Sequence, residues 1–278
     1  MEYVTLNNGV QMPKLGYGVY QTPLEETARC VLEAMEIGYR SIDTAQAYYN
    51  EEGVGEALAE SGLPREEFFL TTKVWITNAG YEKAKASIEE SMRKLRTDYL
   101  DLLLIHQPFG DYYGTYRAME ELYKAGKLRA IGVSNFEPDQ LLDLIAYNQI
   151  VPAVNQIETN LYCQRSAGRV WMDKQQVAHM AYAPLEQGSR NEMYQEPAVL
   201  ALAAKYDKTP AQILLRFLTQ KGVAVIPRST QPAHIRENLA LFDFALTAGE
   251  MVQLSELDRK EPLIGKPETP ELVEFSLT

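Results

Sequence analysis

The sequence predicts a closed (β/α)8 barrel, in which eight parallel strands are surrounded by helices. Short apolar runs alternate along the 278 residues with segments whose apolar residues repeat at helical spacing. No low-complexity linker or block of charge divides the chain. Eight such units form a closed barrel more readily than an open sheet, and single barrels commonly have about 250 residues. We therefore expect one domain that covers residues 1–278.

The predicted strands are short, apolar and spread over the whole chain. They lie near residues 15–19, 40–43, 67–73, 101–106, 129–134, 152–156, 178–183 and 223–227. Between them lie amphipathic segments, of which residues 25–37 and 81–95 have apolar side chains on one helical stripe. These segments are expected to form the outer ring of helices.

The two ends of the chain fall outside the eight units. Residues 3–10 predict a β-hairpin that turns at Asn8 and Gly9, because Asn-Gly between apolar runs is a strong hairpin signal. We expect this hairpin to close the floor of the barrel. Residues 248–278 predict one helix and a short, proline-rich tail.

Composition limits the classes of partner. The formal net charge of −11 disfavours nucleic acid and anionic membranes, because both bind clustered lysine and arginine. Two cysteines, Cys30 and Cys163, are too few for a disulfide framework. No apolar stretch approaches the roughly 18 residues of a membrane span, and no N-terminal signal segment is evident. We expect a soluble, cytoplasmic protein without nucleic-acid or membrane partners.

The residues that follow the predicted strands are unusually polar. They are Asp43, Lys73, His106, Ser134, Asn135, Gln156, Glu158, Tyr182, Arg228 and Ser229. In a parallel barrel the active site lies at the carboxyl ends of the strands. Each residue alone could cap a helix or hydrogen-bond to the backbone of a loop. A barrel without an active site would not need all these polar groups around one rim. The set indicates an active site.

The chemistry follows from the pKa values of four side chains. A tyrosine hydroxyl titrates near about 10, so Tyr48 needs a neighbouring positive charge to donate a proton readily. Lys73 can supply that charge, and Asp43 can keep Lys73 protonated in a desolvated pocket. His106 can orient a carbonyl oxygen. The histidines of the chain lack metal-ligand spacing, so no metal is expected.

These four residues include no nucleophile, so the reactive group must come from a bound cofactor. A carbonyl polarised by Tyr48 and His106 can accept a hydride, which points to a nicotinamide. The Rossmann fingerprint is missing, because Gln21 stands where its third glycine would be. A dinucleotide is therefore expected across the barrel rim, with the polar loop at residues 185–191 as a candidate clasp.

Four motifs closely resemble those of the aldo-keto reductase superfamily. They occupy residues 38–51, 98–106, 132–136 and 226–229. The resemblance runs from about residue 3 to residue 276, and the short tail ending in Glu274 and Phe275 resembles the bacterial branch that includes diketogluconate reductases. It implies a TIM barrel, hydride transfer from NADPH, and Tyr48 as general acid.

The resemblance also implies a cofactor site around the rim. Ser134, Asn135 and Gln156 would hold the nicotinamide carboxamide, and Tyr182 would stack on the ring. The full set that it implies is Gly18, Val19, Tyr20, Ser134, Asn135, Gln156, Tyr182, Pro184, Leu185, Arg228, Ser229, His234, Glu237 and Asn238. The last two match the adenine-contacting pair of the family.

Some positions depart from the family pattern. Arg228 can bind the 2′-phosphate of NADPH in a bidentate way, but His234 stands where members commonly have an arginine. NADPH is still expected, and NADH becomes possible because neutral His234 binds phosphate less well. Gln107 and Ile76 replace Trp and Asn near the expected substrate mouth, so the substrate is not predicted.

The substrate pocket is sketched from the resemblance. Tyr20, Trp75, His106 and Phe109 are the predicted substrate-binding residues, and aromatic walls around a polar centre suit a small carbonyl compound. We therefore predict a monomeric, NADP-dependent reductase of aldehydes or ketones, with keto sugars and dicarbonyls among its candidate substrates. The reaction direction and product stereochemistry are not predicted.

Two alternative functions stay open. A regulatory subunit could bind nicotinamide as a redox sensor with negligible turnover, although four intact catalytic positions argue against this. A lyase or isomerase could form a Schiff base on Lys73, but that requires a lysine with a depressed pKa, and Asp43 would oppose it.

Overall fold

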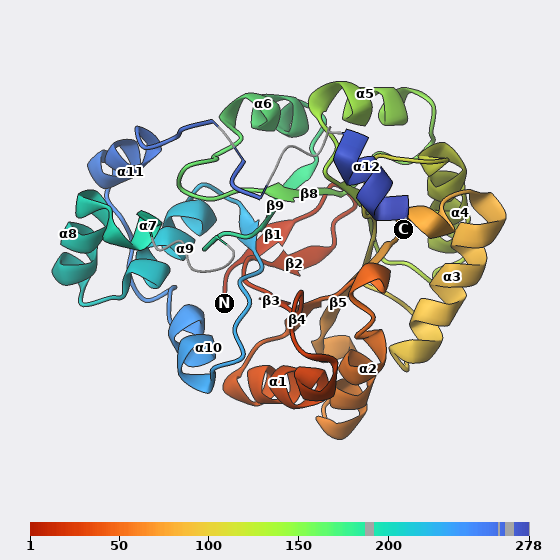
Figure 1. Cartoon of the computed structure of the whole chain (residues 1–278), viewed down its shortest axis with the longest axis horizontal. Helices are drawn as coiled ribbons and strands as arrows, with labels where there is room; N and C mark the ends of the chain where they lie inside the picture. The colour runs from red at the N-terminus through yellow and green to blue at the C-terminus, as the bar shows by residue number, and fades with distance from the viewer. Residues whose placement is uncertain (187–191, 261, 265–269, 278) are drawn as a thin grey trace.

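The computed structural model describes residues 1–186, 192–260, 262–264 and 270–277. A ring of parallel strands lies at its centre, and helices cover the outside (Figure 1). All eight predicted strands are confirmed. They are β3 (Tyr17–Gly18), β4 (Ser41–Asp43), β5 (Phe69–Val74), β6 (Leu102–Ile105), β7 (Ile131–Ser134), β8 (Val154–Glu158), β9 (Ala178–Tyr182) and β10 (Ala224–Val225).

Backbone hydrogen bonds close the barrel between its first and last strands. Neighbouring strands pair in parallel from β3 through to β10. Gly16 N then donates to Val225 O, and Gly18 N donates to Pro227 O. A Cβ on Gly18 would lie 2.8 Å from Ile226 O, so this approach of β3 to the end of β10 requires glycine.

The core has two layers because successive residues of a strand point to opposite faces. In β6, Leu102 and Leu104 pack inside the barrel. Leu103 and Ile105 pack outward against the helices. This alternation explains why each strand is apolar throughout and why polar side chains gather only at its end.

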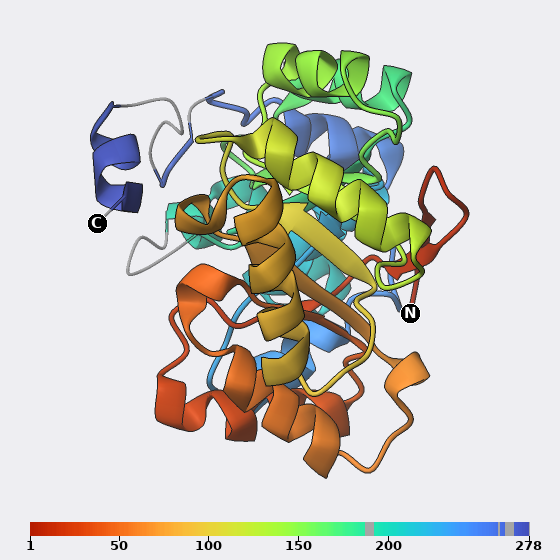
Figure 2. The ribbon, with the colours of Figure 1, turned by 90° about the vertical axis from the view of Figure 1, so that its right-hand side faces the viewer.

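The predicted N-terminal hairpin is confirmed as β1 (Tyr3–Thr5) and β2 (Gln11–Pro13). Leu6 and Met12 pack into the cluster inside the barrel. The side chain of Asn8 donates to Arg129 O, just before β7 begins. The hairpin therefore closes the end at which the strands begin, opposite the C-terminal helix (Figure 2).

Helices connect the strands and form the outer ring. They are α1 (Leu24–Ile37), α2 (Glu51–Glu60), α3 (Tyr81–Lys94), α4 (Tyr112–Lys124), α5 (Pro138–Ala146), α6 (Ser166–Lys174), α7 (Glu192–Gln195), α8 (Pro197–Tyr206), α9 (Pro210–Gln220), α10 (Pro232–Leu239), α11 (Ala248–Ser255) and α12 (Pro270–Leu277), with the 3-10 helices η1 (Gln46–Tyr48), η2 (Arg65–Glu67) and η3 (Ile76–Asn78). The helices predicted at 25–37 and 81–95 are confirmed as α1 and α3. Within the described ranges, no helix combines the length and apolar character needed to cross a membrane.

The prediction of a single helix after residue 248 is wrong. The tail contains α12 in addition to α11. Pro270, one of the prolines of the predicted proline-rich tail, is the first residue of α12. Proline is compatible with a helix there, because its missing N–H has no partner within the first turn.

Candidate active site

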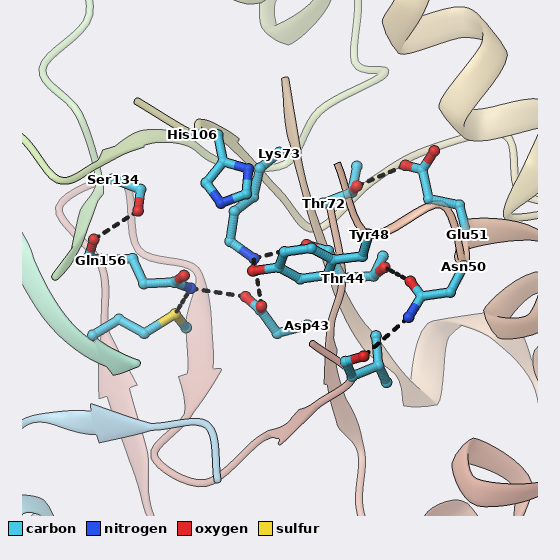
Figure 3. A network of polar contacts seen from close by, with 12 residues as sticks. Asp43, Thr44, Tyr48, Asn50, Glu51, Thr72, Lys73, His106, Ser134 and Gln156 are labelled. Carbon is cyan, nitrogen blue, oxygen red and sulfur yellow. Dashed lines mark hydrogen bonds and ion pairs between the residues drawn. The ribbon is translucent and has the colours of Figure 1, made fainter. Parts of the chain in front are cut away.

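The predicted catalytic side chains meet at the carboxyl end of the barrel (Figure 3). Asp43 ends β4, Lys73 lies in β5, His106 follows β6 and Tyr48 ends η1. Lys73 Nζ lies 2.5 Å from Asp43 Oδ1 and 3.4 Å from Tyr48 Oη. The rings of Tyr48 and His106 meet edge to face, with centroids 5.6 Å apart. Three strands and one short helix thus form a single site.

Two residues of the first motif hold the turn that carries Tyr48. The Asn50 carboxamide accepts from Thr44 Oγ1 at 2.8 Å, just after β4. The Glu51 carboxylate accepts from Thr72 Oγ1 at 2.7 Å, in β5. Both contacts are visible in Figure 3. The sequence motif included Asn50 and Glu51 without indicating this role, which is to fasten η1 to the strands on which Asp43 and Lys73 lie.

Burial dominates the electrostatics of the site. It lowers the pKa of the Lys73 ammonium, and Asp43 opposes this change, as expected. Burial raises the pKa of the Tyr48 hydroxyl well above its usual range, and the Asp43 carboxylate adds to the rise. The Lys73 ammonium lies closer to Asp43 than to Tyr48, and the net shift of the Tyr48 pKa is upward. Tyr48 keeps its proton at neutral pH.

His106 is a neutral imidazole in this environment. Burial lowers its pKa well below the usual range, and the positive charge of Lys73 lowers the pKa further. Its Nδ1 has no hydrogen-bond partner among the described residues. The ring contacts Trp75 edge to face, with centroids 5.0 Å apart. A neutral imidazole still has one N–H with which to bind a carbonyl oxygen.

A cleft of about 960 Å³ opens above these residues. This volume lies within the range of about 300–1,000 Å³ that is typical of small-molecule sites. The predicted site residues that line it are Gly18, Tyr20, Asp43, Tyr48, Trp75, His106, Ser134, Asn135, Gln156, Tyr182, Pro184, Leu185, Arg228, Ser229, His234, Glu237 and Asn238. A second cavity of about 420 Å³, lined by parts of α5 and α6, contains none of them.

Three predicted residues do not line the cleft. Lys73 is fully buried behind Asp43 and acts through its hydrogen bonds. Val19 is fully buried, because it points away from the face that its neighbour Tyr20 presents. Phe109 lies in a turn in which its N–H donates to Gln107 O, and only Gln107 faces the cleft.

The residues predicted to hold a nicotinamide form one network with Asp43. Ser134 Oγ donates to Gln156 O at 2.8 Å, and Gln156 Nε2 donates to Asp43 Oδ2 at 2.8 Å. Tyr182 Oη donates to Asn135 Oδ1 at 2.8 Å. The network places amide and hydroxyl groups beside the ring of Tyr182. A nicotinamide would need both, because its planar ring needs a surface to stack on and its carboxamide needs hydrogen-bond partners.

The far end of the cleft is suited to a phosphate and a purine. Arg228 is exposed, and its guanidinium donates to Gln21 O at 2.5 Å. His234 is also exposed and lines the cleft. Glu237 accepts from Thr209 Oγ1 at 2.5 Å, which orients its carboxylate. One strong cation and an oriented carboxylate are consistent with an anionic, amino-bearing ligand.

Several cleft residues were not found by sequence reasoning. Thr209, Pro210 and Ala211 lie at the start of α9, Tyr194 lies in α7, and Ile264 lies between α11 and α12. The capping box that begins α9 was the available signal, but it predicts a helix start and gives no position in the barrel. Of the predicted clasp, Leu185 and Glu186 line the cleft, and residues 187–191 lie outside the described residues.

The donor set of the cleft fits a dinucleotide. The side chains that line it include the Tyr182 ring, the carboxamides of Asn135 and Gln156, the Arg228 guanidinium and the Glu237 carboxylate. In the described parts of the chain, no three His, Cys, Asp or Glu residues could together hold a metal ion. The lining residues provide the kinds of group that a nicotinamide dinucleotide would need.

Known proteins share this fold and these motifs. Residues 12–259 match the Aldo/keto reductase family. The chain is 42% identical over 267 residues to the glyoxal reductase of Bacillus subtilis, covering 95% of this chain and 96% of that protein. It is 42% identical over 268 residues to the methylglyoxal reductase DkgA of Yersinia pestis, with the same two shares. A Bombyx mori aldo-keto reductase in complex with NADP gives a TM-score of 0.89 at 34% identity, covering 95% of each chain.

The similarity to DkgA agrees with the bacterial branch that the sequence motifs predicted. The family match covers the barrel strands and all the cleft residues except Ile264. The chain therefore belongs to the aldo/keto reductase family.

Proposed function

We propose that this protein reduces aldehydes and ketones to alcohols with NADPH, with Tyr48 as general acid. The observation that carries the proposal is the position of Tyr48 Oη, 3.4 Å from Lys73 Nζ and beside His106 on the wall of the cleft. When bound, the reduced nicotinamide supplies the hydride that the carbonyl carbon accepts. The protein contributes binding, orientation and the proton.

The four polar side chains divide the remaining work. Neutral His106 donates a hydrogen bond to the carbonyl oxygen and fixes its direction. Tyr48 then transfers its proton to that oxygen. The Lys73 ammonium stabilises the phenolate that remains, and Asp43 keeps Lys73 charged despite its burial.

The rest of the cleft supports a preference for NADPH. Arg228 can bind the 2′-phosphate with two parallel hydrogen bonds once it leaves Gln21 O. His234 adds little attraction for the 2′-phosphate. NADH, which lacks this phosphate, should therefore lose less binding affinity relative to NADPH than it would if residue 234 were also a strong base. Glu237 and Asn238 face the adenine in this arrangement.

Small carbonyl compounds are the proposed substrates. Tyr20 and Trp75 line the cleft next to the catalytic rings, with Tyr20 centred 4.9 Å from Tyr48. The names of two relatives, a glyoxal reductase and a methylglyoxal reductase, support small dicarbonyls, and keto sugars remain candidates. Because one chain supplies every lining residue described, we propose that the monomer is active. Buried, unpaired Cys30 and Cys163 fit a cytoplasmic setting.

The test is loss of reduced-nicotinamide absorbance with glyoxal, methylglyoxal, simple aldehydes and keto sugars, with NADPH and NADH in parallel. We expect turnover with at least the dicarbonyls and a higher kcat/KM with NADPH. Tight cofactor binding without turnover of any carbonyl would reject the reductase and leave the redox-sensing subunit as the better description.

A further inference from the structure

The side chain of Gln46 joins three elements at the edge of the cleft. Gln46 is the first residue of η1, the short helix that ends at the general acid. Its carboxamide makes four hydrogen bonds. Oε1 accepts from Trp75 N and Asn78 Nδ2, both at 2.9 Å, and Nε2 donates to Ser91 Oγ at 3.1 Å and Ser87 O at 3.2 Å.

Two backbone groups fix the orientation of this carboxamide. The N–H of Trp75 can only donate, so the atom that faces it must be the oxygen. The carbonyl of Ser87 can only accept, so the atom that faces it must be the nitrogen. Gln46 therefore links the loop after β5 to α3 through hydrogen bonds of defined direction.

The N–H of Trp75 needs this partner because Trp75 lies one residue beyond β5. The last ladder contact of β5 is the pairing of Val74 with Ile105. The N–H of the next residue has left the ladder, and Gln46 Oε1 takes the place of a strand carbonyl. The η3 turn that follows also contacts α12. Gln46 is thus the contact that joins the start of this loop to η1.

Trp75 forms the wall of the cleft nearest the catalytic imidazole. Its ring centroid lies 5.0 Å from that of His106, and the side chain lines the cleft. Tyr48 lies two residues after Gln46 in the same short helix. One side chain therefore links the short helix that ends at Tyr48 to the backbone of Trp75.

We propose that Gln46 is a positioning residue that holds the Trp75 wall in place relative to Tyr48 and thereby sets which carbonyl compounds bind well. The expected effect on substrate preference rests on the proposed reductase function. The positioning of Trp75 by Gln46 does not depend on that function. Loss of the Gln46 contacts frees the η3 loop and weakens binding of substrates large enough to contact Trp75. It leaves the proton donor and the cofactor end of the cleft unchanged.

The structural part is tested by fluorescence. The chain has two tryptophans, so a Trp171→Phe background leaves Trp75 as the only one. Trp171 lies on α6, away from the cleft. Gln46→Met removes all four hydrogen bonds at nearly constant length. We expect acrylamide quenching of Trp75 to rise about twofold, because local opening of η3 becomes easier.

The functional part is tested by comparing a bulky and a small substrate. For Gln46→Met we expect KM for naphthaldehyde to rise about tenfold at nearly constant kcat, which is the pattern of lost binding rather than lost chemistry. KM for methylglyoxal and the Kd for NADPH should stay within about twofold of the parent values. A fall in kcat for both aldehydes with unchanged KM values would overturn the proposed role.

A matched control separates this role from a general loss of stability. Gln220 also holds two backbone groups, because it accepts from Leu246 N at 2.7 Å and donates to Leu246 O at 3.0 Å at the end of α9. Gln220→Met should lower stability without changing Trp75 quenching or the ratio of the two KM values. Similar changes in both variants would show that Gln46 has no special effect on the wall.

A second variant covers the case in which Gln46→Met does not fold. Asn78→Ala removes one donor to Gln46 Oε1 from a half-buried position, so it loosens the same contact more gently. We expect smaller changes in the same directions. Parent-like quenching in Asn78→Ala and in any folded Gln46 variant would reject the proposal. If no carbonyl were reduced by the parent enzyme, the proposed function would fail, and the quenching comparison would still decide the structural part.

Discussion

Lys73 Nζ lies 2.5 Å from Asp43 Oδ1 but 3.4 Å from Tyr48 Oη. The ammonium is therefore paired first with the carboxylate, and its effect on the tyrosine is secondary. Burial, with Asp43, raises the pKa of Tyr48, so its hydroxyl is fully protonated at neutral pH. A protonated hydroxyl is ready to donate, but the raised pKa also makes it a weaker acid, so proton transfer depends on the Lys73 ammonium to stabilise the phenolate.

Tyr48→Phe should nearly abolish carbonyl reduction. It removes the only predicted proton donor and keeps the ring that packs against His106 and Tyr20. General acid catalysis contributes about 10²–10⁴-fold, so we expect kcat to fall by at least about 100-fold. The Kd for NADPH, measured by fluorescence titration, should change little. A variant with most of its activity would show that another group supplies the proton.

His234→Arg should tighten NADPH binding selectively. His234 is exposed at the end of the cleft where Arg228 is the strong cation. A second guanidinium can add a charge-assisted hydrogen bond to the 2′-phosphate, worth about 1.5 kcal/mol or about tenfold in Kd. NADH lacks that phosphate and should bind the variant and the parent equally. Equal Kd ratios for the two cofactors in both proteins would show that residue 234 does not reach the phosphate.

Buried His179 should make the fold less stable in mild acid. Its Nε2 lies 2.7 Å from Thr159 Oγ1, and burial, with Arg169 and Arg165 nearby, lowers its pKa to about 3. The unfolded chain binds a proton near pH 6.5, whereas the folded chain does not until about pH 3. Stability therefore falls as pH drops through this window, by about 2 kcal/mol between pH 7 and pH 5.

The measurement for His179 is urea unfolding at several pH values. His179→Gln keeps a polar group for Thr159 but cannot titrate, so its stability should fall less steeply below pH 6.5. His106 adds a dependence of the same sign, since its pKa is also lowered, and it remains in both proteins. Parallel pH profiles for the parent and His179→Gln would contradict the assignment.

The fold was predictable because each parallel strand is buried on both faces and is therefore a nearly continuous apolar run. Residues such as Asp43 and His106 end those runs, and a barrel gathers strand ends at one rim. That reasoning brought Asp43, Lys73 and His106 together without coordinates, as the structure also does. It also placed Tyr182 and Gln156 on the same rim, where the structure finds them.

Features that depend on distances were not predictable. The pKa of Tyr48 depends first on the burial of its hydroxyl and then on the nearby Asp43 carboxylate, and sequence order gives neither. The burial of Val19 depends on which face of the loop meets solvent. Gln46 carries no sequence signal at all, because its four partners come from other elements that meet it only in the folded chain.

Glu158 offers a last prediction, because its carboxylate fastens the C-terminal segment to the barrel. It ends β8, and it accepts from Leu263 N at 2.6 Å and from Ile264 N at 3.2 Å. Ile264 lines the cleft. Burial raises the pKa of Glu158, and these two backbone donors oppose the rise. The carboxylate thus holds a wall residue of the cleft through main-chain contacts alone.

Glu158→Gln should release residues 263 and 264. The amide NH₂ would face a backbone N–H, so one hydrogen bond is lost and a repulsive contact replaces it, at a cost of about 1–3 kcal/mol. Hydrogen exchange at residues 263 and 264 should accelerate about tenfold or more. Glu120→Gln is the matched control, because Glu120 accepts from Gln149 N and Ile150 N, both at 2.7 Å, through the single oxygen Oε1, which glutamine keeps. That control should leave exchange at 149, 150, 263 and 264 unchanged, and unchanged exchange at 263 and 264 in Glu158→Gln would mean that other contacts hold the segment.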